Sequence, residues 1–383
     1  MPTSKLPTAS PAKVVGWPRR SVSPSTELIH QSFASDTEIS KRTGIVLVNW
    51  NSWPDTLESL ESIFRMEGFS GPVVVCDNGS SDGSVGYIQA WAENLLCSLP
   101  ESQGPEIRSL IIPPVRKSFP VRYLSDGDVE TCDLTEEDAG LWVIQCSSNK
   151  GYAAGNNLGI KLLERFQGIN WFWLLNNDSV PTVDAYARLM EALGDKVQPI
   201  IAGCSLLEYS DPERVQACGA TFNPFLFSTR HNLQGLHVSE LDQRDSLMAV
   251  SYPVGASMIV NRPFIDVVGP MCEEYFLYYE EIDWVVRHSW PSRAFIVTSS
   301  RVYHKGGSTT GAGSGFRSRS LDADYFFIRS RLLFARKRGL VKSAGAMMVT
   351  LVALLRRLLL FRKESVKNAY RAILDGMGGR RLL

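Results

Sequence analysis

The segment WFWLLNNDSVP places two side-chain amides and a carboxylate directly after a run of large apolar residues. An apolar run of this length predicts a buried strand, and Pro181 suits the first turn of a helix. Asn176, Asn177 and Asp178 are therefore predicted to lie where a strand ends. Their oxygens suit a divalent cation or the hydroxyl groups of a ribose. The alternative is ordinary turn chemistry, since Asn and Asp also favour such turns.

A second group of acids lies in YYEEIDWVVRHSW, where Glu280, Glu281 and Asp283 follow the aromatic run YFLYY. We expect YFLYY to form a strand and the acids to open an amphipathic helix. The helix dipole and an ion pair with Arg287, one turn on, account for Asp283. Two adjacent glutamates beside so many aromatic rings indicate another purpose, because burial raises the pKa of a carboxyl group toward the range of a general base.

Polar side chains also follow three other apolar runs. They are Asn51 after IVLVNW, then Asp77, Asn78 and Asp82 after VVVC, and Asn149, Gly151 and Asn156 after WVIQC. In an open α/β sheet the carboxyl ends of parallel strands meet at one edge, where a crevice binds ligands. Four such strand ends predict a nucleotide site, and a carboxylate near a diphosphate fits a divalent cation between the two.

The elements that must position these residues alternate between strands and helices. Strands are predicted over 44–50, 72–77, 141–146 and 170–175. A helical pattern follows each of them, which predicts a mostly parallel sheet covered on both faces. Beyond Pro253 the alternation is less regular, and helices are predicted from Asp322 onward.

The overall composition narrows the class of protein. The 383 residues carry 40 basic and 40 acidic side chains, so no basic excess supports a nucleic-acid partner. The seven cysteines include no C-x-x-C pair, and several lie in apolar runs, which indicates buried, reduced thiols. The N-terminal segment lacks the apolar core of a signal peptide, so we expect a cytoplasmic protein.

Two familiar nucleotide-binding signatures are absent from the sequence. The segment NKGYAAGNNLG spaces its glycines four apart, so it lacks the G-x-G-x-x-G turn of dinucleotide-binding proteins. No G-x-x-x-x-G-K-[ST] loop occurs either. A dehydrogenase and a P-loop nucleotidase are therefore not favoured.

Six segments, taken in order, resemble the inverting glycosyltransferases of family 2, most closely the rhamnosyltransferase-like branch of bacterial surface-polysaccharide synthesis. They are IVLVNWNS, VVVCDNGSSDGS, NKGYAAGNNLGI, WLLNNDSVP, VGASMIVNRPFIDVVG and EEYFLYYEEIDWVVR. The resemblance covers roughly residues 44–338, apart from an insertion at 98–140. It implies a GT-A fold, a nucleotide-sugar donor such as dTDP-rhamnose, a divalent metal (Mn²⁺ or Mg²⁺), and a glycan or lipid-linked acceptor.

The resemblance implies donor-binding roles for residues at the strand ends. Asp77 matches the family residue that meets the nucleoside base. Asn149 and Gly151 match the loop that borders the diphosphate and the sugar. Asn51 and Asn156, at neighbouring strand ends, are assigned to the same donor site.

The metal site is implied by the triplet and by a later histidine. Asp178 keeps the metal-binding carboxylate of the family's D-x-D motif, whereas Asn176 replaces its first Asp and is left for ribose or water contacts. His304, in VYHKGGS, matches a downstream His that completes the metal shell. The alternative for His304 is a strand-end His packed under a loop.

The catalytic base is implied by a Glu-Asp pair that the family carries at EE in YYEEIDW. Its second member takes the acceptor proton, so Glu281 is the predicted base, and Glu280 is its neighbour or a clamp on the acceptor hydroxyl. Because Glu is one methylene longer than Asp, we expect the acceptor to lie slightly farther from this helix than in relatives.

Three regions complete the predicted organisation around a glycosyltransferase domain at 42–338. Residues 1–41, rich in Ser, Thr and Pro, are predicted to be a disordered tail. The insertion at 98–140 has no sustained period, and we expect it to add one hairpin. The Gly/Ser-rich segment 306–315 has the composition of a lid over the donor, or of an exposed linker.

The helical extension at 339–383 contains an apolar run that is too short and too charged for a membrane-spanning helix. Its basic residues fit a helix on an anionic membrane surface, which would make the protein peripheral on the inner face of the cell membrane. They are Arg338, Lys342, Arg356, Arg357, Arg362 and Lys363. A helix packed on the catalytic domain explains the same composition.

Two other functions stay open from the sequence, as does the oligomeric state. A sugar-nucleotide pyrophosphorylase shares an α/β nucleotide fold, but it is expected to begin with a Gly-rich basic loop, which NWNSWPD lacks. A non-catalytic nucleotide-sugar-binding protein fits if the altered D-x-D motif signals lost activity. Release of free nucleoside diphosphate from a sugar nucleotide separates an enzyme from a binding protein.

Overall fold

A computed structural model describes residues 43–96, 104–134, 139–194, 196–288, 294–306, 320–360 and 363–378. The predicted tail at 1–41 lies outside these described residues. So does the predicted lid beyond Gly306.

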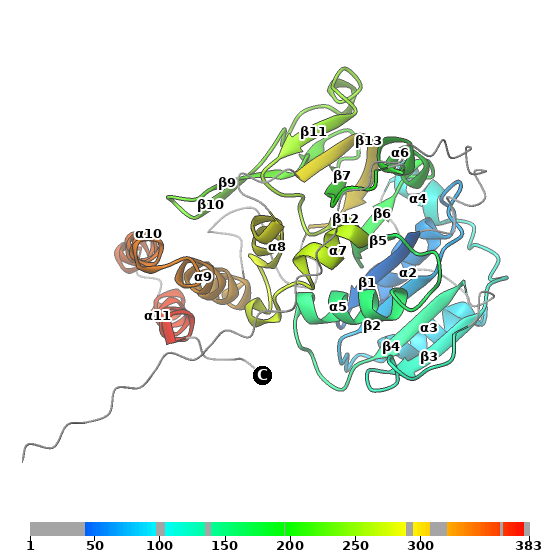
Figure 1. Cartoon of the computed structure of the whole chain (residues 1–383), viewed down its shortest axis with the longest axis horizontal. Helices are drawn as coiled ribbons and strands as arrows, with labels where there is room; N and C mark the ends of the chain where they lie inside the picture. Colours follow the sequence, from blue (N-terminus) through cyan, green and yellow to red (C-terminus); the bar gives the residue numbers. More distant parts are fainter. Residues whose placement is uncertain are drawn as a thin grey trace, which may run out of the picture. The chain divides into compact units, whose positions relative to one another are not determined.

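One large mixed sheet lies at the centre of the fold (Figure 1). Its strands are β1 (Thr43–Asn49), β2 (Val73–Asp77), β3 (Val121–Ser125), β4 (Leu141–Gln145), β5 (Trp171–Asn176), β6 (Ser179–Pro181), β7 (Ile201–Glu208), β8 (Val215–Ala217), β11 (Leu247–Val250), β12 (Ser257–Asn261) and β13 (Ala294–His304). The strand order is β11-β13-β7-β12-β5-β1-β2-β4-β3, with β6 paired to β13 and β8 to β7. Strands β9 (Ala220–Asn223) and β10 (Ser228–His231) form a separate ribbon.

The strand directions bring the carboxyl ends of the parallel strands to one edge of the sheet. Strands β5, β1, β2, β4 and β3 run parallel. Strand β12 is antiparallel to both β5 and β7, and β13 is parallel to β7, so β13 points the same way as β5. The predicted α/β sheet is confirmed, although it is mostly parallel only in the half that contains β1 to β5. The ends of β1, β2, β4, β5 and β13 share an edge.

The parallel half consists of apolar runs because both faces of the sheet are covered. All of β2 and the first five residues of β5 are buried. The strands predicted at 44–50, 72–77, 141–146 and 170–175 are found within a residue of these bounds as β1, β2, β4 and β5.

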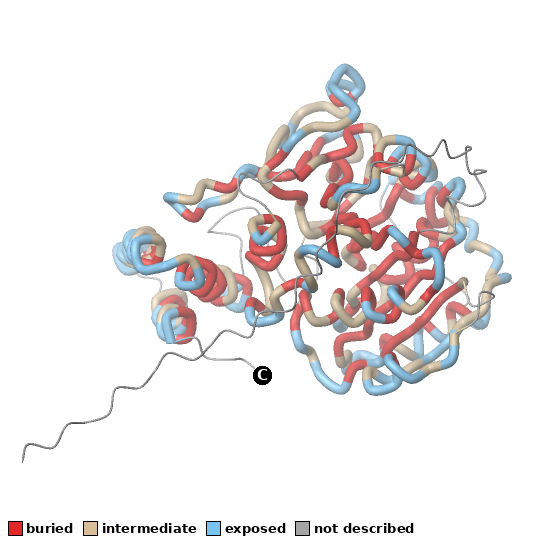
Figure 2. The backbone as a smooth tube through the Cα atoms, in the orientation of Figure 1, coloured by how far each residue is buried: buried red, intermediate tan, exposed pale blue. Residues whose placement is uncertain are grey.

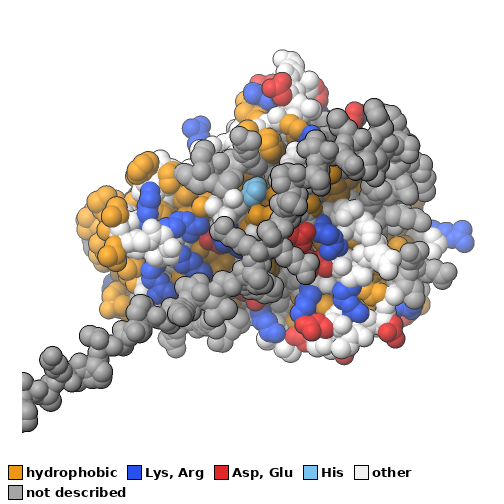
Figure 3. All heavy atoms as spheres, viewed as in Figure 1, with side chains coloured by type: hydrophobic (Ala, Val, Ile, Leu, Met, Phe, Trp, Pro, Cys, Tyr) orange, Lys and Arg blue, Asp and Glu red, His pale blue; other side chains and the backbone are white. Residues whose placement is uncertain are grey.

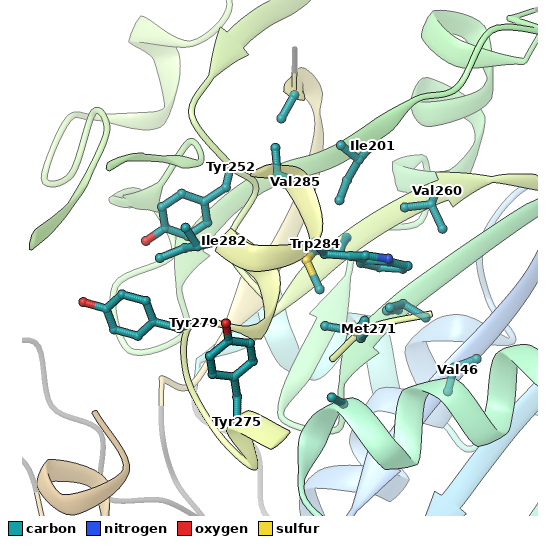
Figure 4. Close-up of a cluster of buried hydrophobic side chains, with 14 of the residues drawn as sticks. Val46, Ile201, Tyr252, Val260, Met271, Tyr275, Tyr279, Ile282, Trp284 and Val285 are labelled. Atoms are coloured by element: carbon teal, nitrogen blue, oxygen red, sulfur yellow. The ribbon is translucent and has the colours of Figure 1, made fainter. Parts of the chain in front are cut away.

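Helices cover the two faces and form a separate group at the C-terminal end. They are α2 (Trp53–Ile63), α3 (Ser84–Ala92), α4 (Pro105–Ile111), α5 (Tyr152–Leu163), α6 (Ala185–Leu193), α7 (Arg262–Val268), α8 (Glu280–His288), α9 (Leu321–Arg336), α10 (Leu340–Leu359) and α11 (Lys363–Gly378). Helices α2, α3 and α6 share one buried cluster with the sheet, and α5, α7 and α8 share another. In Figure 4, Trp284 points from α8 toward the strands that carry Ile201 and Val260.

The described part of the insertion differs from the expected hairpin. It contains α4 and β3, and β3 pairs in parallel with β4, with Val121 opposite Leu141. The prediction of a hairpin is wrong, because the chain between β3 and β4 is long enough for a parallel connection. The segment therefore extends the sheet by one edge strand.

Pro181 does not begin a helix, contrary to the prediction. It ends the short strand β6, which pairs antiparallel with β13, and α6 begins at Ala185. A proline fits here because it lies at the end of a three-residue strand. Asn176 is thus the last residue of β5, and Asn177 and Asp178 form the turn to β6.

The aromatic run YFLYY is not a strand, also contrary to the prediction. A short 3-10 helix, η3, covers Glu273–Tyr275, and the chain then continues irregularly to α8. Phe276, Tyr278 and Tyr279 have positive φ values of 66°, 66° and 72°. This conformation is strained for bulky residues, so surrounding contacts must offset its cost in free energy. Tyr275 and Tyr279 are nevertheless buried, in the cluster of Figure 4.

The C-terminal helices pack on one another, with α9 buried and α10 exposed on its outward side (Figure 2). Arg357 of α10 is buried and its guanidinium contacts both carboxylate oxygens of Asp324 on α9, at 2.6 and 2.9 Å. The expectation that Arg357 faces a membrane is therefore wrong, because this residue lies on the inner side of the helix. None of the helices in the described ranges is long and apolar enough to cross a membrane.

The cysteines in the described residues are free thiols, as expected. Cys76, Cys146, Cys204 and Cys218 are buried, while Cys132 and Cys272 are partly exposed. Burial is the largest cause that raises the pKa of Cys146 and Cys204, each to about 11. These thiols act as small apolar groups in the core.

Candidate active site

The triplet after β5 and the end of β13 meet at the common edge. Strand β6 pairs with β13 so that Ser179 lies opposite His304. This register brings Oδ1 of Asp178 to 3.2 Å from Nε2 of His304. The amide nitrogen of Asn176 lies 3.5 Å from the same imidazole nitrogen. The structure therefore brings the two predicted metal ligands into contact.

Gln216 holds the imidazole of His304 and was not predicted from the sequence. Its Oε1 lies 2.6 Å from Nδ1 of His304, and its Nε2 donates to the His304 carbonyl at 3.0 Å. Because the Gln216 oxygen accepts, we assign a hydrogen to Nδ1 of His304. The other ring nitrogen, Nε2, faces Asp178. Burial is the largest influence and would lower the pKa of His304, but the Asp178 carboxylate outweighs it, so the pKa is raised.

The donor atoms at this edge suit a divalent cation only in part. Among the residues that the structure describes, no group of three or more His, Cys, Asp or Glu side chains could hold a metal ion. Asp178 and His304 offer one carboxylate and one imidazole, and the side chain of Gln216 orients the imidazole through Nδ1, as a hydrogen-bond partner commonly does for a metal-binding His. A cation here would take its remaining oxygen ligands from water or from a bound diphosphate.

Asn177 points into the protein instead of the site. Its Nδ2 lies within 3.3 Å of the Asn49 side-chain oxygen, the Ser52 carbonyl and the Thr56 hydroxyl. Asn49 in turn donates to Oδ2 of Asp77 at 2.7 Å. The middle residue of the triplet therefore ties the end of β5 to the ends of β1 and β2.

Asp77 is fully buried, and its carboxylate is occupied by the protein. Besides Asn49, the backbone N–H of Ser80 donates to it at 3.0 Å. Asn51 is exposed, has φ of 51°, and accepts a hydrogen bond from the N–H of Ser81 at 2.7 Å. The two predicted donor residues lie on one connected pair of loops, but only Asn51 presents its side chain to solvent.

The loop before α5 is fixed by Asn78 and by the chain near Phe276. The Asn78 amide donates to Oδ1 of Asn149 and to the carbonyl of Gly151, both at 3.0 Å. Gly151 has φ of 91°, and a Cβ there would lie 2.4 Å from the Phe276 carbonyl oxygen. The N–H of Tyr152 donates to that oxygen at 2.8 Å. Only glycine fits at position 151, since both the conformation and the close approach require it.

Asn156 lies one turn into α5 and is fully buried. Its Nδ2 donates to the Tyr152 carbonyl at 3.0 Å, while its Oδ1 has no hydrogen-bond partner among the described residues. The side chain is therefore held by the first turn of α5 and is closed off from solvent.

Glu280 and Glu281 open α8 directly after the strained tyrosines. One carboxylate oxygen of each is buried and has no hydrogen-bond partner in the described part of the chain. Burial raises the pKa of Glu281 to about 7. Burial, followed by the charge of Glu281, raises the pKa of Glu280 well above its usual range. Asp283 differs from both, because Tyr275, Arg287 and Arg338 contact it.

Tyr152 connects the two halves of the candidate site and was missed in the sequence. Its hydroxyl donates to the Gly255 carbonyl at 2.6 Å. The next carbonyl, that of Ala256, accepts from the Asn176 N–H at 3.0 Å. Burial is the largest cause that raises the pKa of Tyr152, and the charges of Glu280, Glu281 and Asp178 add to it. No sequence pattern marked Tyr152, because it counts as a single apolar residue in NKGYAAG.

Comparison with known proteins gives only distant similarities. No protein-family model matches the chain, and no curated protein matches it in sequence. The mannosyltransferase PcManGT from Pyrobaculum calidifontis, solved with GDP-Man and Mn²⁺, is 13% identical with a TM-score of 0.46, over 89% of this chain and 76% of that chain. GalNAc-T7, solved with UDP, GalNAc and Mn²⁺, is 12% identical with a TM-score of 0.47, over 76% of this chain and 47% of its own.

A third similar structure is TarS 1-349 of S. aureus. It is 12% identical to this chain with a TM-score of 0.38, over 88% of this chain and 92% of that one. At these identities and TM-scores the likeness alone carries no conclusion about the reaction.

Proposed function

We propose that the chain is an inverting glycosyltransferase that moves a sugar from a nucleoside-diphosphate donor to a hydroxyl group of a glycan or lipid-linked acceptor. The observation that carries this proposal is the pair of adjacent glutamates, each with one buried carboxylate oxygen that has no hydrogen-bond partner among the described residues. The charges of both glutamates and of Asp178 act on the same phenol, that of Tyr152. We propose that a base on α8 and a diphosphate-binding pair at the edge of the sheet act on the same donor and acceptor. Transfer of a glycosyl group with inversion needs a base for the acceptor hydroxyl and a group that stabilises the leaving diphosphate.

Glu281 is the proposed general base. A carboxylate whose pKa is raised to about 7 is partly ionised near neutral pH and still basic enough to accept the acceptor's proton. Its buried oxygen has no hydrogen-bond partner among the residues that the structure describes, and we propose that it binds the acceptor hydroxyl group. Glu280, with the more strongly raised pKa, is proposed to stay protonated and to donate a hydrogen bond to the acceptor.

Asp178 and His304 are the proposed ligands of Mn²⁺ or Mg²⁺. A divalent cation held there would act as a Lewis acid on the leaving diphosphate. The Gln216 contact keeps Nε2 of His304 directed toward Asp178. Asn176, a neutral amide, is proposed to bind the ribose or a water molecule instead of the cation.

The donor contacts are proposed for the residues of the set that keep exposed surface. These are Asn51, Asn149 and Asn176. Asp77 and Asn156 are fully buried, so we assign them to shaping the loops, and Asp77 would reach a base only after Asn49 or Ser80 releases it. Gly151 allows the loop to pass close to Phe276.

The experiment that tests the proposal is release of nucleoside diphosphate. Full-length protein is incubated with dTDP-rhamnose and with UDP- and GDP-sugars, each with Mn²⁺ or Mg²⁺, and free diphosphate is measured. We expect release from one donor class, increased by acceptor, and a product of inverted anomeric configuration by NMR. A thermal shift with a donor but no release from any of them contradicts the proposal and favours a binding protein.

Asp178→Ala tests the metal assignment in the same assay. We expect this variant, and wild-type protein in excess chelator, to lose turnover while the fold survives. Asp184→Ala is the matched control, since Asp184 is a solvent-accessible acid at the start of α6 that pairs with Arg188. Full activity in excess chelator would mean that the Asp178 turn has only a structural role.

A further inference from the structure

Helix α10 has an apolar face that no described part of the chain covers. Val341, Met348, Leu351, Leu355 and Leu358 recur at intervals of seven, three, four and three residues, which is the spacing of one helical face. Their side chains are 85%, 63%, 51%, 57% and 51% exposed. Most monomeric proteins bury such a stripe, so a continuous exposed one indicates a binding surface.

The tip of the β9–β10 ribbon extends this face at the start of α10. Phe225 and Leu226 are 76% and 52% exposed. The Lys342 ammonium group lies 4.7 Å from the centre of the Phe225 ring and 3.4 Å from the Pro224 carbonyl. Two segments more than a hundred residues apart in sequence therefore present apolar side chains together, with a cation between them.

All charged side chains of α10 are basic. The helix contains Lys342, Arg356 and the buried Arg357, and it contains no acid. The neighbouring helix α11 exposes Lys363, Lys367 and Arg371, with Glu364 paired to Lys367. Figure 3 shows apolar and basic side chains gathered together at this end of the molecule. A surface that is apolar and cationic fits an anionic partner.

We propose that this face, the outward side of α10 with the Phe225–Leu226 tip, docks on an anionic phospholipid bilayer. A helix of 20 residues with a wide apolar face and basic flanks binds in the plane of the headgroups, with the apolar side chains toward the acyl chains. A second copy of the chain fits less well, because packing α10 on itself would bring only cations together. The same end of the molecule would then meet acceptors that are carried on lipids.

The test is flotation of full-length protein with vesicles. We expect binding to vesicles of phosphatidylcholine mixed with phosphatidylglycerol, weaker binding to pure phosphatidylcholine, and loss of binding at high salt. The double variant M348E/L355E should reduce the bound fraction by roughly tenfold or more, since it removes two apolar anchors. Val197→Glu is the matched control, because Val197 is 83% exposed outside this face, and it should bind like wild type.

The vesicle experiment tests membrane binding without any measurement of turnover. Circular dichroism and thermal unfolding of the double variant check that both exposed substitutions leave the fold intact. Absence of flotation for the wild-type chain with both vesicle types overturns the proposal. So does a wild-type dimer in sedimentation that M348E/L355E converts to a monomer while neither form floats, because the face would then serve self-association. Vesicle binding and diphosphate release are independent readouts, so failure of one leaves the other standing.

Discussion

Glu280 and Glu281 are unusual because they are neighbours and each has one buried carboxylate oxygen without a hydrogen-bond partner in the described part of the chain. Two carboxylates in such a place do not ionise together at low cost, so one retains its proton when the other ionises, and the ionised one is the base that we propose. Asp283, three residues from Glu280, shows the ordinary arrangement of an acid in a first helical turn, with Arg287 at 3.0 Å and Arg338 at 3.1 Å. The contrast within one turn of helix separates a structural acid from the candidate catalytic pair.

Glu281→Gln is predicted to lower kcat by at least about 10²-fold, because the loss falls on proton transfer. Donor binding should survive, and a thermal-shift titration with the nucleoside diphosphate measures it. Glu280→Gln is the neighbouring control and should keep more turnover, since Gln also donates a hydrogen bond. If Glu280→Gln is the inactive variant and Glu281→Gln turns over almost normally, the base is Glu280.

The same carboxyl groups predict how stability depends on pH. Glu281 titrates at about 7 in the folded chain and near 4.5 when unfolded, so between these values the unfolded chain has released a proton that the folded chain keeps. The free energy of unfolding therefore falls as pH rises through this window. The raised pKa of Glu280 acts in the same direction.

We expect Glu281→Gln to remove this loss and to be more stable than wild type at about pH 8, by on the order of 2 kcal/mol. At about pH 4 the two proteins should be similarly stable, because Glu281 is protonated in both states of the wild type. Urea unfolding of both proteins across this range measures the difference. A gap that stays constant with pH would show that Glu281 is not the group responsible.

At the scale of elements, α5 and the loop of residues 276–279 hold each other in place. The Gly151 backbone packs against Phe276, and the Tyr152 N–H donates to the same residue. This contact fixes the positions from which Glu280 and Glu281 begin α8. The positive φ values at Phe276, Tyr278 and Tyr279 are maintained by such contacts and by packing of the rings, and not by local preference.

Gly151→Ala is predicted to destabilise the fold by about 2 kcal/mol or more, because a Cβ would meet the Phe276 carbonyl and the residue has positive φ. Gly168→Ala is the matched control. Gly168 has φ of 82°, but a Cβ there meets nothing within 4 Å, so this variant carries only the conformational cost. Urea unfolding of the two variants separates the effect of the Cβ contact with Phe276 from the effect of the positive φ. An equal loss of stability in both variants would argue against a packing role for position 151.

Strands that follow a simple hydrophobic pattern could be predicted from the sequence. Runs such as VVVCD and WFWLL are buried on both faces of the sheet, so they are apolar throughout and were found as β2 and β5. The meeting of Asp178 with His304 could be expected only through the resemblance, since no spacing relates residues that lie 126 positions apart. The antiparallel pairing of β6 with β13 brings these two residues together, and no local sequence pattern shows which strands pair.

The missed features depend on tertiary contacts. YFLYY has the composition of a strand, but Arg329 and Ser330 of α9 bind the Tyr275 carbonyl, at 3.3 and 3.0 Å, and favour another path for the chain. Gln216 and Asn49 were missed because single amides in SDPERVQACG and IVLVNW carry no chemical signal until their partners are known. The predicted helix start at Pro181 failed because a three-residue strand is too short to leave a pattern.

At the scale of the whole described chain, the C-terminal helices are joined to the candidate site. The guanidinium of Arg329 donates to the Glu274 carbonyl at 2.9 Å, and Arg338 contacts Asp283 of α8 at 3.1 Å. Helix α9 therefore braces the loop that leads to Glu280. Removing everything after Arg338 would uncover the buried faces of α9, so point substitutions on the outward side of α10 are the cleaner test of membrane binding.

Arg356 and Arg357 give a matched pair for the packing of these helices. Arg357 is 3% exposed and binds Asp324 through both carboxylate oxygens, whereas its neighbour Arg356 lies on the exposed side. Arg357→Met leaves Asp324 buried beside an apolar side chain, and loss of one partner of a buried pair typically costs about 3 to 5 kcal/mol. Arg356→Met should cost less than about 0.5 kcal/mol, as surface substitutions usually do.

Thermal and urea unfolding of the two variants measure this difference. We expect only Arg357→Met to lower the midpoint, and the double variant Arg357→Met with Asp324→Leu to recover part of the loss, because an apolar pair replaces the isolated carboxylate. Since α9 also holds the loop before Glu280, Arg357→Met should lower turnover as well, although Arg357 does not belong to the candidate site. Equal stability of Arg357→Met and Arg356→Met would mean that the ion pair does not hold α10 on α9.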